Sequence, residues 1–290
     1  VIKSPVRIFV GTEAVQFRAE RVLLWSIERV RDPAREYEIH LLKDLVGFDR
    51  SLWLTGFTNY RYAIPELSGF VGRAIYNDVD QIYLDDPAKL FDTDMGNHGV
   101  LSIDDRDTSV MLIDCARLAD TWNLRAARTA NRRKLETPLR KRPGLWGRLD
   151  GAWNARDGEY SPQRSRLVHY TTIHAQPWRP QPRDYVYRGN SAAGIWLELE
   201  RQADAAGFNV FRASQPGPDF PATLWPDVLQ YGRDRSREDR SEPIAVPDDD
   251  RWQELAGKLT EIPDWDIPWV LDGILQATRK PVTFTVDLTR

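Results

Sequence analysis

Two aspartates at the end of a short apolar segment are the residues of this chain best suited to do chemistry. Residues 74–80 read Ala-Ile-Tyr-Asn-Asp-Val-Asp, so Asp78 and Asp80 follow a predicted strand directly. Side chains two positions apart in a strand point to the same side, which brings the two carboxylates together. A divalent cation with hard oxygen ligands offsets their repulsion best, and at a strand end it would be placed to carry a diphosphate. The alternative is an ordinary strand-end turn, where Asp is common.

The elements that must position these aspartates alternate between strand and helix. Apolar spacing predicts a helix over residues 19–30, between buried strands at 7–10 and 37–42. This strand–helix–strand start predicts a mixed, mostly parallel α/β sheet flanked by helices. Further strands are predicted at residues 73–76, 99–103, 109–113 and 167–170, and further helices at 60–67 and 117–135.

Three segments around and after the aspartates carry a family resemblance. They are Phe57-Thr-Asn-Tyr-Arg-Tyr-Ala-Ile-Pro-Glu-Leu67, Asp86-Pro-Ala-Lys-Leu-Phe91 and His169-Tyr-Thr-Thr-Ile-His-Ala-Gln-Pro-Trp178. Their order and chemistry resemble glycosyltransferase family 8, the retaining glycogenin-like and galactosyltransferase-like enzymes with a GT-A fold. The resemblance covers residues 5–180 and implies a nucleotide-binding GT-A domain over residues 1–180.

The resemblance implies a metal site made of Asp78, Asp80 and the closing histidine, His169. His174 is a competing ligand, because its spacing to the following Pro-Trp pair is shorter. A histidine beside two carboxylates suits Mn²⁺ somewhat better than Mg²⁺. We therefore expect Mn²⁺, or Mg²⁺, as the cofactor.

The donor nucleotide is expected to bind near the first strand and near Asp78. The resemblance places the base and ribose at Gly11, Thr12 and Glu13, which follow that strand. Gln176 stands where the family has a lysine before Pro-Trp, so a cation expected beside the diphosphate is missing. We expect Arg61, on the helix before the aspartates, to supply that charge.

The acceptor side departs further from the family pattern. Asp107 stands where family members carry an asparagine, and we expect it to act in catalysis together with the cationic Arg61. The family's Asp-Gln pair, which would line the donor sugar, is not found before residue 150. The sugar and the acceptor are therefore not identified by the sequence.

Composition excludes some functions. The 290 residues carry a net charge of −3, so there is no global basic field of the kind that nucleic-acid binding requires. No apolar run approaches the length of a transmembrane helix. The start lacks a signal-peptide pattern and Cys115 is the single cysteine, so we expect a cytoplasmic protein.

Residues 181–290 are predicted to form a C-terminal extension. It would contain a helix at 192–206, a mobile charged loop at 213–249, helices at 252–259 and 269–277, and a strand at 281–287. Because an apolar strand must pair with something, that last strand joins the main sheet or precedes a further domain after residue 290.

The sequence thus favours a metal-dependent, retaining glycosyltransferase of the hexosyl type. Its donor would be a nucleoside-diphosphate sugar, with UDP expected, and its acceptor a glycan, lipid-linked or small-molecule hydroxyl. One alternative is a nucleotidyltransferase, although Gly11-Thr-Glu13 is not the Gly-rich basic loop that such an enzyme usually has. The other is a catalytically silent module that binds a sugar nucleotide or acts as a scaffold.

Overall fold

The computed structural model describes residues 3–12, 16–43, 45–48, 57–172, 176–178 and 190–208. Several sequence predictions fall outside these residues. They concern Glu13, His174, the loop at 213–249, and the terminal helices and strand at 252–259, 269–277 and 281–287.

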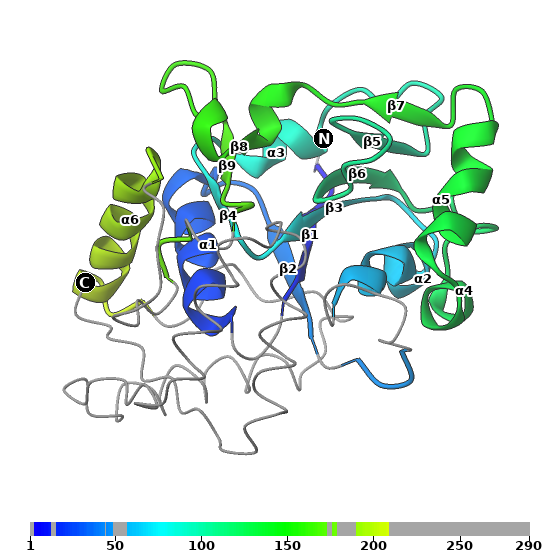
Figure 1. Cartoon of the computed structure of the whole chain (residues 1–290), viewed down its shortest axis with the longest axis horizontal. Helices are drawn as coiled ribbons and strands as arrows, with labels where there is room; N and C mark the ends of the chain where they lie inside the picture. The colour runs from blue at the N-terminus through cyan, green and yellow to red at the C-terminus, as the bar shows by residue number, and fades with distance from the viewer. Residues whose placement is uncertain are drawn as a thin grey trace, which may run out of the picture.

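A six-stranded sheet in the order β2-β1-β3-β6-β5-β7 forms the centre of the described structure (Figure 1). β1 pairs in parallel with β2 and β3, and β5 with β7, while β6 runs antiparallel to β3 and β5. The predicted mixed, mostly parallel α/β sheet is therefore confirmed. The strands are β1 (Val6–Gly11), β2 (Tyr37–Leu42), β3 (Arg73–Asp78), β5 (Val100–Ser102), β6 (Val110–Asp114) and β7 (Trp146–Arg148).

A smaller three-stranded sheet continues from the end of β3. Its order is β4-β9-β8, with β4 at Gln81–Tyr83, β8 at Ala155–Arg156 and β9 at Leu167–His169. β4 and β9 are antiparallel, and Gln81 lies opposite His169 in the register. This register places His169 beside the turn that contains Asp80, although the two residues are far apart in sequence.

Helices cover both faces of the large sheet (Figure 1). They are α1 (Phe17–Val30), η2 (Thr58–Ala63), α2 (Ile64–Leu67), α3 (Pro87–Phe91), α4 (Leu124–Thr129), α5 (Arg132–Lys141), η3 (Gly151–Trp153), η4 (Asp157–Glu159) and α6 (Ala193–Ala205), where η marks a 3₁₀ helix. The single helix predicted over residues 117–135 is wrong. The side chain of Asn131 accepts a hydrogen bond from the backbone of Lys134 and begins α5 there, because an asparagine side chain satisfies the first free N–H groups of a helix.

Strand alternation divides the core into two clusters on opposite faces of the sheet. In β1, Ile8 and Val10 face α1, whereas Phe9 faces η2 and α4. β3 repeats this pattern, because Ile75 joins the first cluster and Tyr76 the second. Figure 1 shows α1 on one side of the sheet and α2, α4 and α5 on the other.

Helix α6 packs along α1 and belongs to the first of these clusters, to which it contributes Trp196 and Ala203 (Figure 1). A buried ion pair joins the two helices, in which Arg18 Nη2 lies 2.7 Å from Glu200 Oε2. The predicted division of the chain at residue 180 stays a prediction. No helix in the described ranges is both long and apolar enough to cross a bilayer.

Candidate metal and nucleotide site

Asp78 and Asp80 lie at the carboxyl end of β3, at the centre of the large sheet. Asp78 is the last residue of the strand, and Asp80 lies in the turn that leads into β4. Their side chains are largely buried, with 16% and 22% of their surface exposed. Two carboxylates at such buried positions need a positive partner, because burying an unpaired charge costs on the order of several kcal/mol.

Arg61 supplies the positive charge beside Asp78. Its Nη2 donates to Asp78 Oδ1 at 2.8 Å, and the hydroxyl of Tyr76 donates to the same oxygen at 2.5 Å. The guanidinium also stacks over the Tyr76 ring, 4.5 Å from its centroid. Burial raises the pKa of Asp78 to about 6, even though Arg61 acts to lower it. Burial would lower the pKa of Arg61, but the Asp78 charge raises it above the ordinary value.

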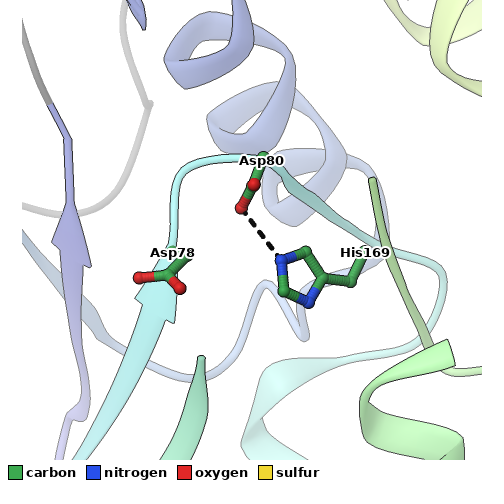
Figure 2. Close-up of side chains that lie close together, drawn as sticks. All are labelled: Asp78, Asp80 and His169. Carbon is green, nitrogen blue, oxygen red and sulfur yellow. Dashed lines mark ion pairs between the residues drawn. The ribbon is translucent and has the colours of Figure 1, made fainter. Parts of the chain in front are cut away.

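His169 completes a group of three possible ligands. One ligand atom each from Asp78, Asp80 and His169 lie within 4.8 Å of one another. Figure 2 shows the three side chains close together at the end of β3, the following turn and β9, with the Asp80 carboxylate facing the His169 ring. His169 Nε2 lies 3.1 Å from Asp80 Oδ1, and the carboxylates together raise the pKa of the imidazole against the opposing effect of burial.

These residues fit a divalent cation. Asp80 Oδ1 is buried, and His169 Nε2, 3.1 Å away, offsets its charge only while the imidazole is protonated. A buried carboxylate oxygen without a donor is unfavourable unless a positive ion is bound to it. Two carboxylates and an imidazole, with ligand atoms within 4.8 Å of one another, are ligands that Mn²⁺ accepts.

Gly11 is needed for packing at this edge of the sheet. A Cβ atom at Gly11 would lie 2.2 Å from Tyr76 Oη and 2.8 Å from a ring carbon of Phe57. The missing side chain thus allows the Tyr76 hydroxyl to reach Asp78. The sequence suggested a different reason, namely a close approach of the nucleotide to the backbone, and this stays a prediction.

Thr12, the second residue predicted to hold the nucleotide, takes part in a buried polar cluster. Its Oγ1 donates to Glu20 Oε2 at 3.1 Å, and Lys43 Nζ lies 3.3 Å from Glu20 Oε1. Burial raises the pKa of Glu20, against the lowering effect of Lys43. Glu20 and Lys43 were not predicted from sequence, since each reads as an ordinary helix or loop charge until the ends of β1, β2 and α1 come together.

Gln176 and Asp107 lie near the three possible ligands, Asp78, Asp80 and His169, but they form hydrogen bonds with different groups. Gln176 Nε2 donates to Tyr170 O at 2.8 Å and lies 3.3 Å from Asp80 Oδ2. Asp107 accepts hydrogen bonds from Ser109 and from Asn154 rather than standing beside Asp78 as a direct partner. The catalytic role predicted for Asp107 stays a prediction.

Asn154 and Tyr76 are polar neighbours of the site that sequence reasoning missed. Asn154 Oδ1 lies 2.9 Å from His169 Nδ1. Tyr76 had a local signal, because it precedes Asp78 by two positions on the same strand face. Asn154 had none beyond its place in a Trp-Asn pair, since its partner is 15 residues away.

Two solved structures resemble this chain. The WbbM bifunctional glycosyltransferase, in its apo structure, is 13% identical with a TM-score of 0.51, over 69% of this chain and 50% of WbbM. The apo form of the glycosyltransferase GlyE of Streptococcus pneumoniae TIGR4 is 15% identical with a TM-score of 0.50, over 81% of this chain and 64% of GlyE. The chain thus spans about half the length of WbbM. No protein-family model and no curated protein sequence matches it.

The fold and these likenesses define the class of structure. The chain has the GT-A fold of glycosyltransferases, which confirms the fold predicted from the sequence. At 13–15% identity the likeness concerns the fold alone. Membership of glycosyltransferase family 8 stays a prediction.

Proposed function

We propose that this chain is a metal-dependent glycosyltransferase that transfers a sugar from a nucleoside diphosphate to a hydroxyl acceptor. The observation that carries the proposal is the convergence of Asp78, Asp80 and His169 at the carboxyl end of a central strand in a GT-A fold. UDP is the expected nucleotide, and a hexose the expected sugar. The resemblance to family 8 favours retention of configuration at the anomeric carbon.

The residues of the site would have different roles. Asp78, Asp80 and His169 would hold Mn²⁺ or Mg²⁺, which supplies charge neutralisation to the leaving diphosphate. Arg61 keeps Asp78 ionised and fixed through its hydrogen bond to Oδ1. Gln176 spans from Asp80 to the Tyr170 carbonyl and restrains the turn that carries Asp80.

The nucleotide pocket would lie between the triad and the start of α1. β1 ends there at Gly11 and Thr12 follows it, and Gly11 pairs with Asp78 in the parallel register. The base and ribose of the donor would thus lie one strand away from the cation. The positive charge of Arg61 adds to that of the ion where the two phosphates are expected.

Calorimetry tests the proposal directly. UDP, GDP and UMP are titrated into the chain with Mn²⁺ and, separately, with a chelator. With Mn²⁺, UDP and GDP should both bind more tightly than UMP, because only a diphosphate offers the ion two phosphate groups, and UDP is expected to bind best. Asp80→Asn should lose the metal-dependent part of the affinity, whereas the control Asp120→Asn, an exposed carboxylate, should keep it.

Transfer itself is then measured by the release of UDP from a panel of UDP-sugars with Mn²⁺. Equal affinity for UDP with and without metal would contradict the metal-dependent mechanism. A preference for GDP would keep the mechanism and change the donor. Tight, metal-dependent binding without release of UDP from any donor sugar would favour the silent sugar-nucleotide-binding module.

A further inference from the structure

The two ring nitrogens of His169 face different partners. Nε2 lies 3.1 Å from Asp80 Oδ1, inside the predicted metal site. Nδ1 lies 2.9 Å from Asn154 Oδ1, on the opposite side of the ring. A neutral imidazole carries one N–H, so the partner of Nδ1 decides whether the lone pair of Nε2 is available to an ion.

The orientation of the Asn154 amide is itself decided by Asp107. Asn154 Nδ2 lies 2.9 Å from Asp107 Oδ2 and 3.1 Å from Ser109 Oγ. An ionised carboxylate can only accept hydrogen bonds, so the amide end that faces Asp107 must be the NH₂ group. The other end, which faces His169, is then the carbonyl oxygen. A carbonyl oxygen can only accept, and it therefore requires a hydrogen on His169 Nδ1.

Asp107 is held in place by hydrogen bonds, so it can fix the orientation of the Asn154 amide. Its Oδ1 accepts hydrogen bonds from both the hydroxyl and the backbone N–H of Ser109, at 2.5 Å and 3.0 Å. Two arginines of α5, Arg132 and Arg140, donate to backbone carbonyls of the loop that carries Asp107. Asn154 is 2% exposed and His169 5% exposed, so water competes little for these bonds.

We propose that Asp107 and Asn154 are positioning residues that keep a hydrogen on His169 Nδ1 and so direct the Nε2 lone pair at the cation. The part of this inference that concerns the cation rests on the proposed function, whereas the hydrogen on Nδ1 does not. Asp107 then acts through Asn154 and does not touch the substrate. This role differs from the direct catalytic role expected from the sequence, which stays a prediction.

Asp107→Asn tests the direction of the hydrogen bond to Asn154 while leaving the shape of the side chain at position 107 almost unchanged. An amide at position 107 has nearly the same size as the carboxylate, but it can donate as well as accept. Asn154 is then free to turn its NH₂ group toward His169, which favours the tautomer with its hydrogen on Nε2. The matched control is Asp105→Asn, which removes the same charge from the same loop at a side chain that is 55% exposed.

Two measurements test this proposal. The first is the affinity of the site for Mn²⁺. Mn²⁺ titrated into each variant by calorimetry should bind roughly 10–100-fold more weakly to Asp107→Asn and to Asn154→Ala than to the wild type, the usual effect of losing a partner of a ligating histidine. Asp105→Asn should stay within about twofold of the wild type, because it leaves the amide direction intact. Unchanged affinity in both Asp107→Asn and Asn154→Ala would overturn the proposal.

The second measurement needs no metal. A ¹H–¹⁵N spectrum of the imidazole nitrogens of the metal-free wild type is recorded above the raised pKa of His169, where the ring is neutral. It should show a slowly exchanging proton on His169 Nδ1, and Asn154→Ala should lose it. A wild-type Nδ1 without a bound proton would overturn the proposal. A wild type that shows this proton but binds no Mn²⁺ would contradict the proposed function and still support the positioning.

Discussion

Replacing Arg61 tests how the buried charge of Asp78 is compensated. Arg61 is 4% exposed, and its Nη2 donates to Asp78 Oδ1 at 2.8 Å. Its other donors reach Thr58 O at 2.9 Å, Thr108 O at 2.6 Å and Thr108 Oγ1 at 2.8 Å. Arg61→Met fills similar space without charge and leaves the Asp78 carboxylate buried. We expect it to lower the free energy of unfolding by about 3–5 kcal/mol, as when one partner of a buried pair is removed.

Arg61→Lys tests how much of the stabilisation by Arg61 depends on the shape of its guanidinium group. An ammonium group keeps the charge, but it is a point donor and cannot reach Thr58, Thr108 and Asp78 together. If it keeps the bond to Asp78, the three bonds to the threonines are lost. At about 0.5–1.5 kcal/mol for each bond, the expected cost is about 1.5–4.5 kcal/mol.

The assay is urea unfolding of the metal-free chain at pH 7, followed by circular dichroism and by tryptophan fluorescence. Coincident transitions by the two probes justify a two-state free energy. Arg133→Met is the control, because Arg133 is exposed on α5 and its loss should change stability by less than about 0.5 kcal/mol.

A double-mutant cycle with Asp78→Asn completes the test. Once Asp78 carries no charge, Arg61→Met should cost less by about 1.5–3 kcal/mol, the contribution of a charge-assisted hydrogen bond. If the stability changes of the two single variants sum to that of the double variant within about 0.5 kcal/mol, Arg61 and Asp78 are not coupled and the reasoning about Asp78 is refuted.

Three further predictions concern the metal, the docking of α6 and acid stability. Mn²⁺ at 100 times its dissociation constant should add about 2.7 kcal/mol of stability, and hence raise Tm by roughly 4–5 °C for a chain of 290 residues. Scanning calorimetry should show this rise and its loss in Asp80→Asn; a rise retained in Asp80→Asn would exclude Asp80 as a ligand. Glu200→Ala should lower the free energy of unfolding by about 3–5 kcal/mol, because Arg18 then stays buried without its partner. A urea midpoint equal to that of the wild type would show that the pair does not hold α6 on α1. The nearby His40 ring, 3.9 Å away, and Arg7, whose Nε donates to Glu38 Oε2 at 3.1 Å, lower the pKa of Glu38 from 4.5, so Glu38 binds fewer protons in the folded state. Its stabilisation is therefore present above pH 4.5 and is lost as the pH falls through the lower, folded pKa, so Glu38→Gln should flatten the fall of Tm between about pH 5 and pH 3. Parallel Tm curves for Glu38→Gln and the wild type would contradict this.

Local patterns in the sequence were sufficient to predict the sheet and the aspartates. The limits of β2 were predicted at both ends, at residues 37 and 42, and β3 was recognised from three apolar and aromatic residues, Ala74, Ile75 and Tyr76, before the aspartates. Period-two alternation and helical spacing act between near neighbours, so they are visible in a single sequence. For the same reason the break between α4 and α5 was missed, since an asparagine cap competes with helical spacing only through its side-chain hydrogen bond.

The partners of the site residues were decided by the tertiary structure. The sequence assigned Arg61 to the diphosphate, and the fold buries it against Asp78, 17 residues away. It assigned Asp107 to catalysis, and the fold places it against Asn154, 47 residues away. Gly11 suggested a ligand, and in the structure its missing side chain makes room for the Tyr76 hydroxyl.

The chain by itself thus determined which groups are available and on which strand ends they lie. Residue type and spacing along a strand set this much, because both act over a few residues. Which group neutralises, orients or crowds another depends on contacts between segments that are distant in sequence. Only the packing of β3, η2, β9 and the loop before β6 around one sheet edge decided those contacts, since burial there leaves each polar atom few partners to choose from.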